Sequence, residues 1–199
     1  MTELDLADLV ANRTMSAQMA ETLRDTARHH HSFVVTAIPR LAGKTTVLAA
    51  MLAEREDGVP ARVTTGSAEE LRTLAGSDER GYLVIPEISD APVPGYLWGA
   101  PVRRVFTALA GGFSLATALH SSGVEETFEI VCRGNGVTDE QAARIALVVY
   151  IRSLGRDWRA PTGRRVASVD EVLGVSGGRP RTRRLHRWDE ATDRFETEG

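Results

Sequence analysis

The stretch FVVTAIPRLAGKTTVLAAML, residues Phe33–Leu52, decides the fold. It begins with a short, mainly apolar run that reads as a buried strand, and its last nine residues form an apolar helical segment. Between the two lies a turn that ends in Gly43-Lys44-Thr45. A strand, a turn and a helix in this order place free backbone N–H groups at the start of the helix, where they attract an anion. The stretch therefore predicts a phosphate-binding loop.

The loop keeps only the second half of the G-x-x-x-x-G-K-[ST] pattern. Gly43 lets a phosphate approach the backbone, Lys44 neutralises its charge, and Thr45 offers a hydroxyl to Mg²⁺. Ile38 stands where the pattern has its first glycine, and a β-branched residue resists a left-handed backbone. A turn that merely contains Gly-Lys-Thr is the alternative interpretation. The expected nucleotide-binding residues are Pro39, Arg40, Leu41, Ala42, Gly43, Lys44, Thr45 and Thr46.

The use of lysine favours a phosphate site. Lys44 is the only lysine in the sequence, and arginine supplies the other basic residues of the 24. A phosphate-binding loop needs a compact ammonium on a long stem, and a planar guanidinium fits that place badly. The one lysine stands at the position that requires it.

The composition fits a globular chain of one domain with a small appendage. The net charge of −3 gives no reason to expect a nucleic-acid partner. Cys132 is the single cysteine, which suits a reducing compartment. The opening MTELDLADLV is acidic and unlike a secretory signal, and no apolar run reaches the roughly 18 residues of a membrane span. We expect a cytoplasmic protein without membrane insertion.

Strands alternate with helices over residues 33–152, and this predicts an α/β fold with a mostly parallel sheet. Ser16 caps an expected helix before the first strand, and Thr138, with Gln141 three residues later, predicts a long helix over residues 138–154. After Thr162, short β-like runs flank GVSGG. We therefore expect an α/β domain over 1–161 and a small antiparallel β appendage over 162–199.

Four segments, in the right order, resemble the C-terminal ATPase domain of the type II/type IV secretion ATPase superfamily. The loop is similar to G-P-T-G-S-G-K-T-T, with departures at Ile38, Leu41 and Ala42. YLVIPEISD resembles the Walker B element G-E-I-R-D and keeps Glu87, and LATALHSS resembles the histidine box and keeps His120. VASVDEVLGVSGG and LHRWDEATDRF are similar to the C-terminal β segment of the tight-adherence and conjugation-type branch.

The resemblance implies a P-loop NTPase three-layer sandwich of RecA type that binds ATP and Mg²⁺. It implies that Thr45 and Glu87 hold the metal, or that Glu87 orients the attacking water. It implies that His120 senses the γ-phosphate or couples subunits. Arg72 is the expected arginine that reaches a neighbour's phosphates; surface arginines 103, 104 and 152 compete for this role. It also implies a homo-oligomer, or a hetero-oligomer with secretion or pilus machinery.

Two departures from the pattern of this superfamily leave two functional hypotheses open. The place of the family's acidic box holds Gly66 and Ser67, and the family's separate N-terminal domain has no counterpart before the loop, which begins about 37 residues in. The first hypothesis is an ATP-binding, secretion-type protein whose hydrolysis is weakened or lost. The second is a non-catalytic scaffold or regulatory subunit of such an assembly that no longer binds nucleotide.

Overall fold

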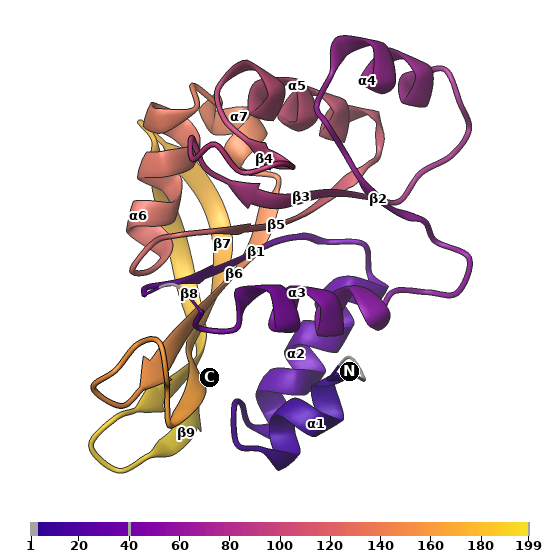
Figure 1. The fold of residues 1–199 in the computed structure, drawn as a ribbon. Helices are drawn as coiled ribbons and strands as arrows, with labels where there is room; N and C mark the ends of the chain where they lie inside the picture. The colour runs from indigo at the N-terminus through magenta and orange to yellow at the C-terminus, as the bar shows by residue number, and fades with distance from the viewer. Residues whose placement is uncertain (1–3, 40, 199) are drawn as a thin grey trace.

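A computed structural model describes residues 4–39 and 41–198. In this part of the chain a central sheet of nine strands has the order β2-β3-β5-β1-β6-β7-β8-β9, with β4 paired to β3 (Figure 1). The strands from β2 to β6, and β4, are parallel, whereas β7, β8 and β9 are antiparallel. The strands are β1 Ser32–Ala37, β2 Ala61–Val63, β3 Tyr82–Ile88, β4 Tyr96–Leu97, β5 Ser114–Leu119, β6 Ile145–Leu154, β7 Gly163–Ser176, β8 Arg179–Asp189 and β9 Arg194–Thr197.

Helices cover both faces of the parallel part of the sheet. In Figure 1, α1 to α3 lie below the sheet, and α4 to α7 lie above it. Each face buries its own apolar core, one built around Phe33 and Met51 and the other around Phe106 and Leu115. The helices are α1 Leu6–Ala11, α2 Ala17–Arg28, α3 Lys44–Ala53, α4 Ala68–Ala75, α5 Ala100–Ala108, η1 Leu109–Gly111, α6 Val124–Phe128, the π-helical η2 Glu129–Gly134 and α7 Asp139–Ala142.

The α/β architecture and the mostly parallel sheet are confirmed. The N-cap of α2 is also as predicted, since the Ser16 hydroxyl accepts the Met19 N–H at 3.1 Å. The three-layer arrangement places the carboxyl ends of β1, β3 and β5 next to one another, because these strands are neighbours in the sheet. Ligands of open α/β sheets bind at such an edge.

The long helix predicted over residues 138–154 is wrong. Only Asp139–Ala142 is helical, and Ile145–Leu154 forms β6 between β1 and β7. The capping box was identified correctly, because the side chains of Thr138 and Gln141 bond each other's backbone N–H groups. The run that follows is rich in β-branched residues, which favour a buried strand once a partner lies on each side. Tertiary pairing therefore overrode the helix start signal.

The C-terminal segment forms antiparallel strands, as predicted, but they are long and continue the central sheet. β7 pairs with β6, so there is no break between the two parts of the sheet. The turn between β7 and β8 rests on the start of α7, where the Asp139 carboxylate accepts the N–H groups of Gly177 and Gly178 at 2.7 and 2.8 Å. The division of the chain at residues 161/162 stays a prediction.

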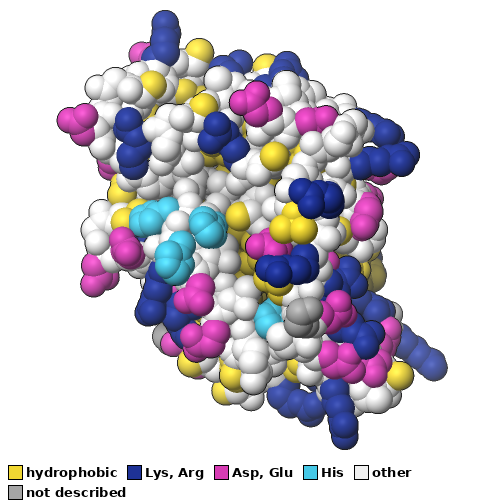
Figure 2. Space-filling view, turned by 180° about the vertical axis from the view of Figure 1, so that it is seen from behind, with side chains coloured by type: hydrophobic (Ala, Val, Ile, Leu, Met, Phe, Trp, Pro, Cys, Tyr) yellow, Lys and Arg dark blue, Asp and Glu magenta, His cyan; other side chains and the backbone are white. Residues whose placement is uncertain are grey.

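The surface mixes charges of both signs. On the face seen in Figure 2, Lys and Arg side chains are interspersed with Asp and Glu. This agrees with the exposed arginine–carboxylate pairs of the fold, such as Arg152 with Glu190 at 2.6 Å and Arg62 with Glu79 at 2.6 Å. Among the helices of residues 4–39 and 41–198, none has the length and apolar character that a membrane span requires.

Candidate nucleotide site

The loop between β1 and α3 leaves a hollow at the start of the helix. Gly43, at φ 97°, takes the left-handed conformation at the N-cap of α3, and Leu41 has φ 63°. Ile38 and Leu41 are 44% and 61% exposed. Both apolar side chains thus keep much of their surface exposed, and Leu41 is one of the residues that line the cavity described below.

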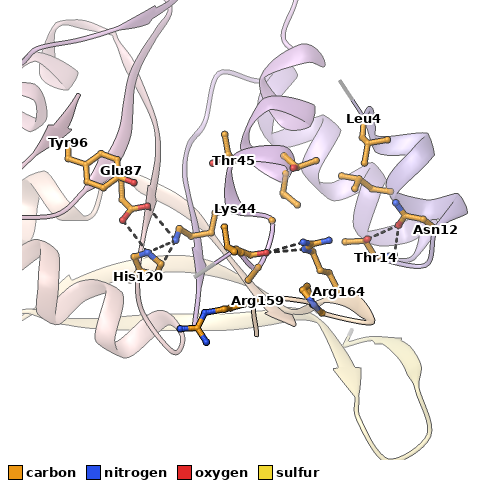
Figure 3. Close-up of a pocket in the computed structure, with 17 residues that line it drawn as sticks. Leu4, Asn12, Thr14, Lys44, Thr45, Glu87, Tyr96, His120, Arg159 and Arg164 are labelled. Carbon is orange, nitrogen blue, oxygen red and sulfur yellow. Dashed lines mark hydrogen bonds and ion pairs between the residues drawn. The ribbon is translucent and has the colours of Figure 1, made fainter. Parts of the chain in front are cut away.

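Lys44, Glu87 and His120 converge at this hollow, although they come from three separate segments (Figure 3). The Lys44 ammonium lies 3.4 Å from the Glu87 carboxylate and 3.0 Å from His120 Nε2, and Glu87 Oε1 lies 3.3 Å from the same ring nitrogen. The side chains of Lys44 and Glu87 are only 9% and 8% exposed. Their opposite charges compensate each other, as buried charges require.

The fold explains why these three side chains meet. Lys44 follows β1, Glu87 is near the end of β3, and His120 directly follows β5. Since β3, β5 and β1 are adjacent parallel strands, all three residues lie at one edge of the sheet. Thr36 Oγ1 fixes the turn after β5 by donating to the Ser121 carbonyl at 2.9 Å. His120 Nδ1 lies 3.2 Å from the Ala37 carbonyl, which holds the ring against the end of β1.

Two arginines that sequence reasoning missed also face the hollow. Arg164, on β7, donates from Nε and Nη2 to the Leu41 carbonyl at 3.2 and 3.0 Å. Its stem lies so close to Gly43 that a Cβ there would be 2.9 Å from Arg164 Cδ. Arg159 lies nearby, with its guanidinium 4.7 Å from the ring centre of Trp158. No local motif marks either arginine, because the pairing of β6 with β7 brings this segment to the loop.

Together these residues surround a cavity of about 600 Å³. Its size suits a small-molecule ligand, and its lining combines apolar side chains with a few charged groups. The lining residues are Leu4, Leu9, Asn12, Thr14, Leu41, Ala42, Gly43, Lys44, Thr45, Thr46, Val47, Glu87, Tyr96, His120, Arg159, Pro161 and Arg164.

Most of the predicted site residues lie at this cavity. Leu41 to Thr46, Glu87 and His120 line it, whereas Pro39 is absent from the lining and Arg40 lies outside the described residues. Arg72 is on α4, where its Nε donates to the Ala68 carbonyl at 3.1 Å, and it lines a different cavity. Its predicted contact with a neighbour's phosphates stays a prediction.

Gly66 and Ser67, where the resemblance led us to expect an acidic box, have a structural role. The Ser67 hydroxyl caps α4 by accepting the Glu70 N–H at 3.1 Å, and Gly66 takes φ 63°. A Cβ at Gly66 would lie 2.8 Å from the Pro101 carbonyl oxygen, so the backbone here packs too closely for a larger residue. Neither residue brings a carboxylate to the cavity.

The residues at the cavity fit a magnesium ion that is held jointly with phosphate. Magnesium prefers oxygen ligands and takes one or two from the protein, with water and phosphate oxygens as the others. Thr45 and Glu87 offer a hydroxyl and a carboxylate at the same cavity. Residues 4–39 and 41–198 hold no group of three or more His, Cys, Asp or Glu that would bind a metal without a nucleotide.

Comparisons with known proteins show the same fold. The chain matches the VirB11 ATPase of the Brucella suis type IV secretion system, solved in complex with sulphate, with 20% identity and a TM-score of 0.54 over 82% of this chain and 55% of that one. It matches the ATPase DotB of Legionella pneumophila with 15% identity and a TM-score of 0.50 over 97% and 53%. The chain thus spans about half the length of each. No protein-family model and no curated protein sequence matches it.

Proposed function

We propose that this chain binds ATP with Mg²⁺ at the Lys44 cavity and acts as a secretion or pilus ATPase-like subunit in the cytoplasm. The observation that carries the proposal is the convergence of Lys44, Glu87 and His120 within 3.0–3.4 Å beside the first turn of α3. The fold shared with the VirB11 ATPase of a type IV secretion system and with the ATPase DotB supports it.

In this proposal the backbone around Gly43 and the ammonium of Lys44 hold the β- and γ-phosphates. Thr45 and Glu87 hold the metal and its water shell, which supplies charge neutralisation at the phosphates. His120 lies where a γ-phosphate would alter its contact with Glu87. Arg164 and Arg159 add positive charge on the open side of the cavity.

We further propose that hydrolysis is weakened or lost. Phosphoryl transfer depends on groups that position the metal and the attacking water. Gly66 and Ser67 bring no carboxylate to this task. Glu87 is left as the one acidic residue among those that line the described cavity.

A calorimetric titration with MgATP tests the binding proposal. We expect saturable binding in the micromolar range that Lys44→Ala abolishes. Lys44→Arg should also bind poorly, because a guanidinium does not replace the ammonium in such a loop. Arg62→Lys, at the exposed pair with Glu79, is the control and should bind as the wild type does. A phosphate-release assay should then give turnover far below that of a competent ATPase; a robust rate that depends on Glu87 would refute weakened hydrolysis.

The second candidate is a scaffold or regulatory subunit that binds no nucleotide. It is favoured by the loop itself, where Leu41 at φ 63° takes a conformation that side chains disfavour and Arg164 packs over Gly43. Absence of binding at millimolar MgATP, in a protein that is folded by circular dichroism, would select this candidate. Assembly into a homo-oligomer or with secretion machinery belongs to both candidates, and a mass measurement in solution tests the homo-oligomer.

A further inference from the structure

A second cavity, of about 390 Å³, lies between α4 and α5, and it shares no described lining residue with the Lys44 cavity. Small residues leave the hollow open, since Ala68 and Ala75 face it from α4 and Ala108 from α5. Its apolar floor includes Leu71 and Phe113, which are buried. A concave, mostly apolar cavity of this size suits a small ligand rather than a long peptide.

Three arginines surround this apolar hollow: Arg72, Arg80 and Arg104. Among the residues that the structure describes, each donates only to backbone carbonyls: Arg72 to Ala68, Arg104 to Gly66 at 2.7 Å, and Arg80 to Ser77 and Glu79 at 2.8 and 2.7 Å. Arg80 also lies with its guanidinium 5.4 Å from the centre of the Phe113 ring.

No carboxylate compensates this charge within the described part of the chain. None of the three arginines forms an ion pair there, and no Asp or Glu lines the cavity. The nearby Glu79 pairs with Arg62 instead, at 2.6 Å. A guanidinium carries five N–H donors, so each arginine retains donors for a ligand.

We propose that this cavity binds an amphiphilic anion, a small molecule with an apolar body and a carboxylate or comparable anionic group. The apolar body lies against Leu71 and Phe113, and the anionic group faces the arginines. Burial of the body supplies the affinity, and charge-assisted hydrogen bonds to guanidinium select the anion. An uncharged molecule of the same shape leaves the arginines without an anionic partner.

Decanoate is a suitable probe, with decanol as its uncharged match. In calorimetry with the full chain, we expect saturable decanoate binding. Decanol should bind at least about tenfold more weakly, because it lacks the anionic group and so loses one charge-assisted hydrogen bond. Shifted amide signals in ¹H–¹⁵N spectra should map to α4 and α5. Equal affinity for the two probes, or shifts confined to other elements, would overturn the proposal.

Substitutions localise the site further. Ala75→Trp fills the cavity from an exposed helix position, so the fold should tolerate it, and it should abolish decanoate binding. Arg72→Ala should weaken binding about three- to tenfold. Arg133→Ala removes an exposed arginine elsewhere and should change nothing. If Ala75→Trp and Arg72→Ala bind decanoate normally, the proposal fails.

Two competitors decide the class of ligand. MgATP should not displace decanoate, because the two cavities are separate. Displacement by MgATP would refute an independent site, while failure of the chain to bind MgATP at all would refute only the nucleotide proposal. An acidic amphipathic peptide that binds here when decanoate does not would make this surface a protein-docking site and overturn the small-ligand proposal.

Discussion

Arg164 on β7 holds the carbonyl oxygen of Leu41 with two hydrogen bonds, of 3.2 and 3.0 Å, and thereby joins the C-terminal strands to the loop that begins α3. The two residues are 123 positions apart, which is more than half of the sequence. It fixes a loop whose Leu41 takes a left-handed backbone without help from a glycine. The loop conformation thus depends on a residue far away in sequence.

We predict that Arg164→Ala weakens MgATP binding about fivefold, the equivalent of roughly 1 kcal/mol for the lost positive charge and loop contact. The free energy of unfolding should fall by about 0.5–1 kcal/mol, since the guanidinium is partly exposed. Calorimetry and urea unfolding measure the two effects. Arg181→Ala is the control, because Arg181 also donates to a backbone carbonyl, with one bond of 3.0 Å from Nη2 to Leu173, but away from the cavity. Equal losses of affinity in both variants would contradict a specific role for Arg164.

Gly43→Ala should lower stability by about 2 kcal/mol, for two reasons. Its φ of 97° disfavours any Cβ, and that Cβ would meet Arg164 Cδ at 2.9 Å. Gly58→Ala measures the backbone cost without the steric one, because Gly58 has φ 83° and no atom lies within 4 Å of the added Cβ. It should cost about 1 kcal/mol from backbone strain alone. Chemical unfolding of both variants gives the difference, and equal losses for Gly43→Ala and Gly58→Ala would show that Arg164 moves aside.

Local sequence signals were sufficient to single out Lys44, Glu87 and His120, which the structure brings to one cavity. Apolar runs mark β1, β3 and β5, and the loop, Glu87 and His120 lie at or near the carboxyl ends of these strands. The order of the strands in the sheet then brings the three together. The sequence predicted a mostly parallel sheet but not the order of these strands, so the shared edge is a finding of the structure.

The sequence does not predict the remaining features, because they depend on pairing over long distances. Residues 145–154 contain enough apolar side chains for a helix or a strand, and only the positions of β1 and β7 decide between them. Arg164 reaches the loop through the antiparallel pairing of β6 with β7. Arg72 lines the second cavity from α4, a position that its place between two motifs did not indicate, and its predicted contact with a neighbour's phosphates stays a prediction.

Glu87→Gln should lower the free energy of unfolding of the nucleotide-free protein by about 1–3 kcal/mol. It leaves the buried Lys44 ammonium without its carboxylate, which lies at 3.4 Å in the wild type. Lys44→Met in the Glu87→Gln background should recover much of this loss, since it removes the uncompensated charge. Guanidinium unfolding of the single and double variants completes a double-mutant cycle. A coupling near zero would mean that the pair does not stabilise the site.

The link between α2 and the C-terminal strands should make stability depend on pH. His186 on β8 is buried, with Nε2 2.8 Å from Thr22 Oγ1 and Nδ1 3.0 Å from Thr197 Oγ1. Burial lowers the pKa of His186 below its usual 6.5, because the charged ring is disfavoured there. Below pH 6.5 the unfolded chain therefore binds more protons at this residue than the folded one.

It follows that the contribution of His186 to stability is complete above pH 6.5 and is lost as the pH falls from there through the lower folded pKa. The pKa of Asp193 is also lowered, chiefly by its hydrogen bond from Arg165. The contribution of Asp193 to the stability of the protein is lost only below about pH 3.8. Urea unfolding between pH 7.5 and 5 thus isolates the histidine. His186→Gln should flatten the decline across this range, and His29→Gln, at the exposed end of α2, should keep the wild-type decline. An unchanged slope in His186→Gln would show that other groups govern this window.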